Sequence, residues 1–129
     1  MARNTATFVV DKEVSLEQGS LVRLDGGKLV AATAATHDAI GVIEDGTTGD
    51  YAEDQLRSVA IAGICQMRVN GDGTAIEAGD LLMPGAGGKA VKVNPSASHV
   101  EMARALEGSE ADGDLIYVLK FSRNHAVTV

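Results

Sequence analysis

Residues 76–93, which read IEAGDLLMPGAGGKAVKV, decide the fold of this chain. An apolar run lies between two glycine-containing turns, and a lysine opens the apolar run that follows the second turn. Gly79 can adopt a positive φ without steric cost, and the short Asp80 side chain can bond to nearby backbone groups. Gly87 and Gly88 then reverse the chain. The segment therefore predicts a turn, a strand, a tight reversal and a partner strand.

An earlier segment repeats this pattern. Residues 16–31 read LEQGSLVRLDGGKLVA, with Leu16 lying 60 positions before Ile76. The spacing becomes 61 at Gly26 and Gly87, because the second copy has one extra residue in its reversal. We interpret the two segments as a duplicated hairpin unit, although glycine-rich hairpins can also resemble one another by chance. The residues assigned to its structural turns are Gly19, Gly26, Gly27, Gly79, Asp80, Gly87 and Gly88.

A weaker match follows each copy. Residues 40–44 resemble residues 103–107, which lie 63 positions later. The match favours a strand over a helix for residues 100–106, where apolar spacing suits either. Val59–Val69 shows a firm period-two alternation with one apolar face, in which Gly63 predicts a bulge or a close backbone approach.

Composition places the chain among all-β domains. It has 129 residues, 15 glycines, two prolines and four aromatic residues, so it favours short antiparallel strands joined by tight turns. The formal net charge of −7 argues against nucleic-acid binding, and no apolar stretch is long enough for a membrane span. The single cysteine, Cys65, excludes an intrachain disulfide and fits a reducing compartment. We expect a single β domain over residues 13–129.

Residues 1–12 precede that domain. Phe8, Val9 and Val10 form a short apolar patch that is either a first edge strand or an extended arm that adds to the sheet of a partner. Residues 115–119 are apolar on both faces, which predicts a central strand covered on both sides. In so small a domain, a partner subunit would have to cover the second face.

No catalytic, cofactor-binding or metal-binding residues can be nominated. The three histidines, His37, His99 and His125, lack metal-ligand spacing and are expected to be solvated at the surface. Cys65 is expected to be a buried, inert thiol. The glycine-rich turn before Lys89 lacks the residues of a phosphate-binding loop.

The chain resembles the small capsid decoration proteins of tailed bacteriophages, also called cement or head-stabilisation proteins, of the short β-tulip type. The resemblance lies in residues 76–82 and 87–92, and it continues through residues 103–107 and 111–119. Residues 19–22 and 40–42 also fit, so most of the chain from Leu16 to Phe121 is covered. The resemblance implies no enzyme activity and a fold that is a small β-barrel or β-tulip.

The resemblance also implies a homotrimer on the outer capsid surface that binds the major capsid protein and stabilises the expanded head, assembled in bacterial cytoplasm. An extended N-terminal arm would reach the capsid protein, and removal of residues 1–11 would leave a folded domain. The expected arm contacts are Thr5, Thr7, Phe8, Val9 and Val10. One alternative is a non-catalytic β-clip or carrier-type module of a larger enzyme system; Lys28 and Lys89 both lie at hairpins, but neither has the flanking methionines expected of a biotinyl or lipoyl carrier. The other alternative is a phage tail or baseplate subunit.

Overall fold

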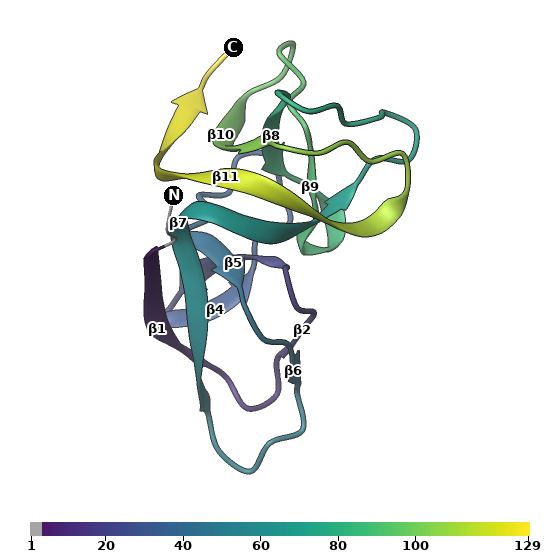
Figure 1. Cartoon of the computed structure of the whole chain (residues 1–129). Helices are drawn as coiled ribbons and strands as arrows, with labels where there is room; N and C mark the ends of the chain where they lie inside the picture. Colours follow the sequence, from purple (N-terminus) through teal and green to yellow (C-terminus); the bar gives the residue numbers. More distant parts are fainter. Residues whose placement is uncertain (1–3) are drawn as a thin grey trace.

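The computed structural model describes residues 4–129, which form strands and turns with one short 3-10 helix (Figure 1). The lower lobe in Figure 1 contains β1 (Asn4–Val10), β2 (Ser15–Leu16), β3 (Leu21–Asp25), β4 (Lys28–Ala31), β5 (Gly41–Ile43) and β6 (Thr47–Thr48). The upper lobe contains β8 (Leu81–Pro84), the 3-10 helix η1 (Ala86–Gly88), β9 (Ala90–Lys92), β10 (His99–Ala105) and β11 (Asp112–Val127). The long strand β7 (Gln55–Asn70) runs through both lobes. The predicted all-β class is therefore confirmed.

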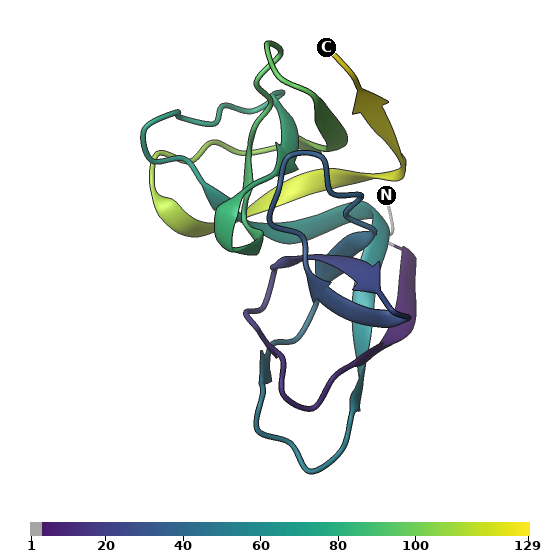
Figure 2. The ribbon, with the colours of Figure 1, turned by 180° about the vertical axis from the view of Figure 1, so that it is seen from behind.

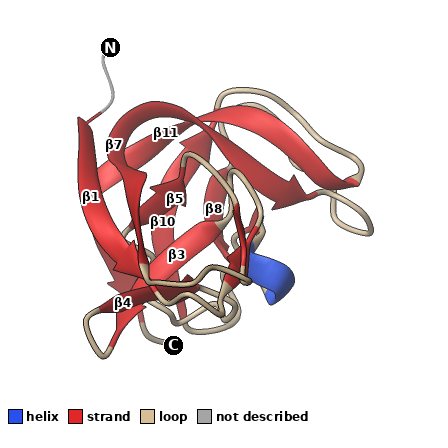
Figure 3. Ribbon diagram, turned by 90° about the horizontal axis from the view of Figure 1, so that it is seen from below, coloured by secondary structure: helices blue, strands red, loops and turns tan. Residues whose placement is uncertain are grey.

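Strand pairing closes into a circuit in each lobe. In the lower lobe the order is β1-β4-β3-β5-β7, and β1 also pairs with β7. In the upper lobe the order is β7-β11-β10-β8-β9, and β9 returns to pair with β7. The β1–β4 and β7–β9 pairs are parallel, and β7 and β11 have 16 residues each. The expectation of short antiparallel strands throughout is therefore wrong, because each circuit closes through a parallel pair. Figure 3 shows the strands from below.

The two lobes are copies of one strand pattern. Val10 pairs with Gln55 and Leu29 in the lower lobe, and Val69 pairs with Asp114 and Ala90 in the upper lobe. The residues of β1 and of the first half of β7 correspond to residues 59 positions later, as in Val10 and Val69. We therefore define repeat 1 as residues 4–62 and repeat 2 as residues 63–121, with the second half of β7 as the first strand of repeat 2.

The remaining registers agree with this equivalence. Positions in β3 match positions 60 later in β8, as in Leu21 and Leu81. Positions in β4 match those 61 later in β9, so the predicted hairpin duplication is confirmed with both of its spacings. Gly19 donates its N–H to the Ile43 carbonyl, and Gly79 donates to the Ala105 carbonyl. Ile43 is thus equivalent to Ala105, 62 positions later, and the spacing of 63 predicted for this segment was one residue too long.

The segment expected to form an arm is a strand of the sheet. All seven residues of β1 pair with β7, and Val10 is 1% exposed. Apolar side chains at alternate positions explain this, since Phe8 and Val10 point into the lower core while Thr5 and Thr7 are exposed. Removing residues 1–11 would delete a strand of the lower circuit. Residues 1–3 of the predicted arm lie outside the described part of the chain.

Two buried clusters hold the chain together. The lower cluster contains Val10, Val22, Leu29, Ile43 and Val59. The upper cluster contains residues of repeat 2 such as Met67, Leu82, Met102 and Val118, and it also includes Leu21, Val42 and Ala60 from repeat 1. Those three lie on the outer face of the lower lobe, so the upper core extends across the junction between the two lobes.

Turn chemistry agrees with the sequence. The six glycines assigned to turns all have positive φ, from 61° at Gly26 to 96° at Gly79. Asp80 accepts the Glu77 N–H at 2.8 Å, as expected of a short polar residue after the turn glycine. No helix in residues 4–129 is long and apolar enough to cross a membrane.

Candidate functional site

The five residues predicted to contact a partner lie on β1, and their side chains alternate between the two faces of the sheet. Thr5 and Thr7 are exposed and Val9 is half-buried on the outer face, while Phe8 and Val10 pack against the lower core. Val9 lies opposite Leu56, which is 66% exposed. The outward residues of this predicted contact are therefore Thr5, Thr7 and Val9, next to an exposed leucine that sequence reasoning did not single out.

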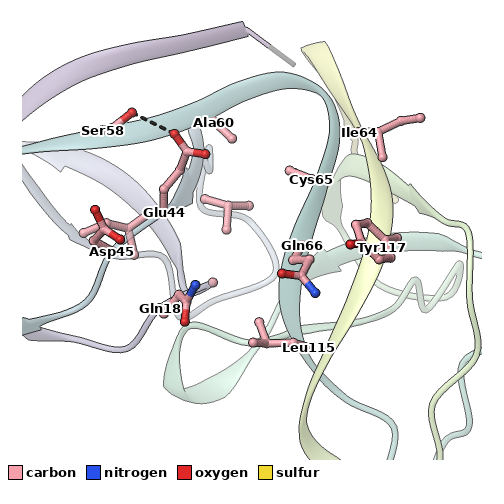
Figure 4. A pocket seen from close by; sticks show the side chains of 13 residues that line it. Gln18, Glu44, Asp45, Ser58, Ala60, Ile64, Cys65, Gln66, Leu115 and Tyr117 are labelled. Carbon is pink, nitrogen blue, oxygen red and sulfur yellow. Dashed lines mark hydrogen bonds between the residues drawn. The ribbon is translucent and has the colours of Figure 1, made fainter. Parts of the chain in front are cut away.

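A groove of about 460 Å³ lies in the corner between the two lobes (Figure 4). Repeat 1 lines one wall with Glu44 and Ser58, whose hydroxyl donates to the Glu44 carboxylate at 2.8 Å. Repeat 2 lines the other wall with Gln66, Leu115 and Tyr117. The groove has acidic and amide side chains but no lysine, arginine or histidine, so it does not suit a phosphate ligand.

Cys65 also lines this groove, at 7% exposure on the apolar face of β7. A thiol becomes a nucleophile when a neighbouring base or cation favours its thiolate. No histidine lines the groove beside it, and the cation that interacts with its sulfur is the buried ammonium of Lys120. Within residues 4–129, no group of three or more His, Cys, Asp or Glu side chains could hold a metal ion.

Two basic side chains, His99 and Lys120, are buried among residues 4–129. His99 is 2% exposed, with Nδ1 2.7 Å from the Ala97 carbonyl and Nε2 3.1 Å from the Glu101 carboxylate. These acceptors raise the pKa of His99, the Ala97 carbonyl most strongly. The expectation that His99 is solvated at the surface is therefore wrong. Its partners, Ala97 and Glu101, lie two residues before and after it, and the spacing between histidines gives no information about them.

Lys120 is the second of these groups, at 3% exposure. Its ammonium donates to the Phe121 carbonyl at 2.7 Å and to Asn124 Oδ1 at 2.9 Å. Burial away from water lowers the pKa of Lys120 to about 8, against a smaller opposing effect of Cys65 and Asp38. The burial of Lys120 was not predicted, because a lysine directly after an apolar run such as residues 115–119 is expected at the exposed end of a strand.

The two hairpin lysines form ion pairs. Lys28 lies 3.0 Å from Asp54 and 3.3 Å from Asp11, and Lys89 lies 2.8 Å from Asp112. In each repeat, the lysine thus pairs with an acid close to the start of the last strand. These contacts give both lysines a structural role, which does not favour the carrier module.

Comparisons with known proteins agree with this architecture. The sequence pattern of the phage cement protein family matches residues 2–120. The structure is similar to that of the head fiber gp8.5 N base of bacteriophage phi29, with a TM-score of 0.63 and 18% sequence identity. The match covers 95% of this chain and 98% of that one. No curated protein matches the sequence significantly.

The similarity to the phi29 protein concerns the fold, whereas the family match spans nearly the whole chain. The chain belongs to the phage cement protein family, and it is a non-catalytic structural protein of the virion that decorates the capsid.

Proposed function

We propose that this cement protein binds the outer surface of the capsid as a homotrimer and stabilises the expanded head. The family match over residues 2–120 carries the proposal. A shell under internal pressure separates at the seams between its capsomers, and a bound protein that spans a seam adds contact area across it. Buried apolar surface contributes roughly 25 cal/mol per Å², before the costs of association.

The charge and the fold support this placement. A net charge of −7 suits an outward surface that does not contact packaged DNA. The additional β1–β7 and β7–β9 pairings close each circuit of strands, which leaves few unpaired strand edges to aggregate on a crowded shell. Many copies on one head act together, so modest affinity at each site suffices.

The contact with the major capsid protein is assigned to the outer face of β1. Thr5 and Thr7 are exposed there, and Val9 lies beside them. Phe8 and Val10 support this face from the core rather than touch the capsid. The assignment narrows the five predicted residues to Thr5 and Thr7, whose side chains are exposed.

Binding to heads that lack the protein tests the proposal. Wild-type protein should co-sediment with such heads and raise the temperature at which their DNA becomes accessible to a dye. A Thr5→Asp/Thr7→Asp double variant should bind at least tenfold more weakly. Thr74→Asp is the matched control, because Thr74 is exposed in the turn after β7, far from β1.

Wild-type protein that fails to sediment with expanded heads would refute capsid binding. Equal binding by the double variant would move the contact away from β1 while leaving the function intact. Binding without any rise in the DNA-release temperature would refute stabilisation alone.

A further inference from the structure

The junction between the two repeats buries one face of repeat 1. Leu21, Val42 and Ala60 lie in a row across β3, β5 and β7 on the outer face of the lower lobe. They are 0%, 1% and 1% exposed, and they belong to the upper core cluster. Repeat 2 therefore covers this outer face of repeat 1 and makes it part of the upper core.

Backbone contacts fix this junction. The Arg68 N–H in the second half of β7 donates to the Gly19 carbonyl at 2.8 Å, just before β3. The loop between β4 and β5 reaches behind the upper lobe, where the Ala35 carbonyl accepts the Val100 N–H at 2.7 Å (Figure 2). A Cβ on Gly88 would lie 3.5 Å from Ala31, so η1 also packs on repeat 1.

Repeat 2 carries the equivalent face without a cover. Leu81, Arg104 and Leu119 stand in the same row across β8, β10 and β11, because Leu81 pairs with Arg104 and Arg104 pairs with Leu119. None of the three is buried. Beside them, Leu106 and Tyr117 are 43% and 48% exposed. We call these five residues the free face of repeat 2.

Repeat 1 carries the surface that complements this face. Phe8 and Val9 in β1 are equivalent to Met67 and Arg68 in β7, which form the repeat 2 side of the junction. Met67 is 0% exposed, whereas Phe8 is only half-buried. Phe8 lines a hollow of about 470 Å³ between repeat 1, which contributes Leu24, Ile40 and Ile61, and the end of β11, which contributes residues 120 and 122–124. The side chain of Phe8 is therefore less covered than that of its equivalent, Met67.

We propose that copies of this chain join head to tail, with the free face of repeat 2 packed against β1 of the next copy. The contact between copies repeats the contact between repeats within one chain. By this equivalence the Val9 N–H of one copy donates to the Gly79 carbonyl of its neighbour, as Arg68 donates to Gly19. A Cβ on Gly79 would meet no atom within 4 Å, so that turn is open to an approaching strand.

The contact between copies changes the bonding of Arg104 and leaves Thr7 accessible. Arg104 donates to the Gly79 carbonyl at 2.7 Å in the isolated chain, and it exchanges this exposed bond for one from the Val9 backbone. Thr7 stays accessible to the capsid, because its equivalent Gln66 is exposed beside the groove at the intrachain junction.

Head-to-tail contacts are heterologous and generate a ring when their rotation closes. Three copies would place six repeats around that ring.

This inference rests on the trimer in the proposed function and states how its copies meet. Light scattering after size-exclusion chromatography should give 3 × 13.3 kDa, about 40 kDa, for the wild type. Arg104→Glu damages the free face and Val9→Glu damages the β1 side, so each variant alone should be a folded monomer of 13.3 kDa. Thr74→Glu is the control and should remain trimeric. Circular dichroism melts verify that each variant is folded.

Mixing the two variants separates a head-to-tail contact from every symmetric one. Each variant keeps one intact surface, so the mixture should form a 1:1 heterodimer of 2 × 13.3 = 26.6 kDa and nothing larger. A wild-type monomer at millimolar concentration, a folded variant that remains trimeric, or a mixture that remains monomeric would overturn the inference.

The capsid assay distinguishes this inference from the function on which it rests. Wild-type monomers that still sediment with heads would refute the head-to-tail contact and leave capsid binding intact. A trimer that does not sediment with heads would refute capsid binding and leave the head-to-tail contact intact. Unchanged oligomeric state with lost capsid binding in Arg104→Glu would assign the free face to the capsid protein.

Discussion

Replacing Lys120 with methionine is the sharpest test of the electrostatics of this fold. The two side chains have similar length and are unbranched, so the methionine can fill the same space. Repeat 1 has an apolar residue, Ile61, at the equivalent position. Lys120 is 3% exposed, and burial lowers its pKa from 10.5 to about 8.

The pKa shift sets the magnitude. A lowering of 10.5 − 8 = 2.5 units corresponds to about 3 kcal/mol of unfavourable free energy for the charged form in the folded state. Methionine removes this cost but also the bonds to the Phe121 carbonyl and Asn124, each worth about 1.5–3 kcal/mol because the donor is charged. The variant should therefore be no more stable than the wild type at pH 7.

The stability of the wild type relative to Lys120→Met increases as pH rises. The unfolded chain holds its lysine proton up to about pH 10.5, while the folded chain releases it near pH 8, so the wild type becomes more stable across this window. By pH 9.5 it should have gained about 2 kcal/mol relative to Lys120→Met. Urea unfolding of both proteins at pH 7 and pH 9.5, followed by circular dichroism, measures this difference.

Lys12→Met removes an exposed lysine and serves as the charge-matched control. Comparing variants at each pH cancels the titration of all other groups. A stability difference between wild type and Lys120→Met that stays constant from pH 7 to pH 9.5 would refute the reasoning, because it would mean that the buried ammonium is as well solvated as in the unfolded chain.

Three further predictions concern the upper lobe and its equivalent positions. Met67→Ala should cost about 2–5 kcal/mol of unfolding free energy, and Phe8→Ala should cost less in the monomer because Phe8 is only half-buried. Equal losses in urea unfolding would contradict this difference in burial. Glu101→Gln should lower the raised pKa of His99 in an NMR titration. Because protonated His99 stabilises the fold below about pH 6.5 and this contribution disappears as pH rises through the raised pKa, the variant should lose more stability at pH 5 than at pH 9. Cys65 should react with a thiol reagent only as fast as the protein unfolds, and rapid labelling of the native protein would show an open path to the sulfur.

Local chemistry explains which parts of the fold could be predicted. Positive φ at Gly19 and Gly79 and a short polar residue after each are properties of single residues, so the turn and hairpin of each copy followed from sequence. Period-two alternation likewise predicted β7, since a half-buried strand must alternate. The spacing of 63 failed because residues 40–44 and 103–107 share few side chains, whereas their equivalence depends on backbone bonds such as Gly79 to Ala105.

The role of the first strand required the tertiary structure. The apolar patch at Phe8 and Val10 suits an edge strand or a partner-seeking arm equally well, because both need a partner strand. Only the folded chain shows that β7 is long enough to pair with β1 over its first half and with β11 over its second. The same limit applied to His99 and Lys120, whose burial depends on segments that are distant along the chain.

The sequence by itself thus determined the all-β class, the duplicated hairpin, the lack of a nominated catalytic site and the resemblance to capsid decoration proteins. These features are encoded in residue type and short-range spacing. Tertiary structure decided that the duplication extends to whole lobes, that one strand serves both, and that only the first of two equivalent faces is covered. The Leu21 face is buried because repeat 2 packs on it, whereas nothing among residues 4–129 covers the Leu81 face.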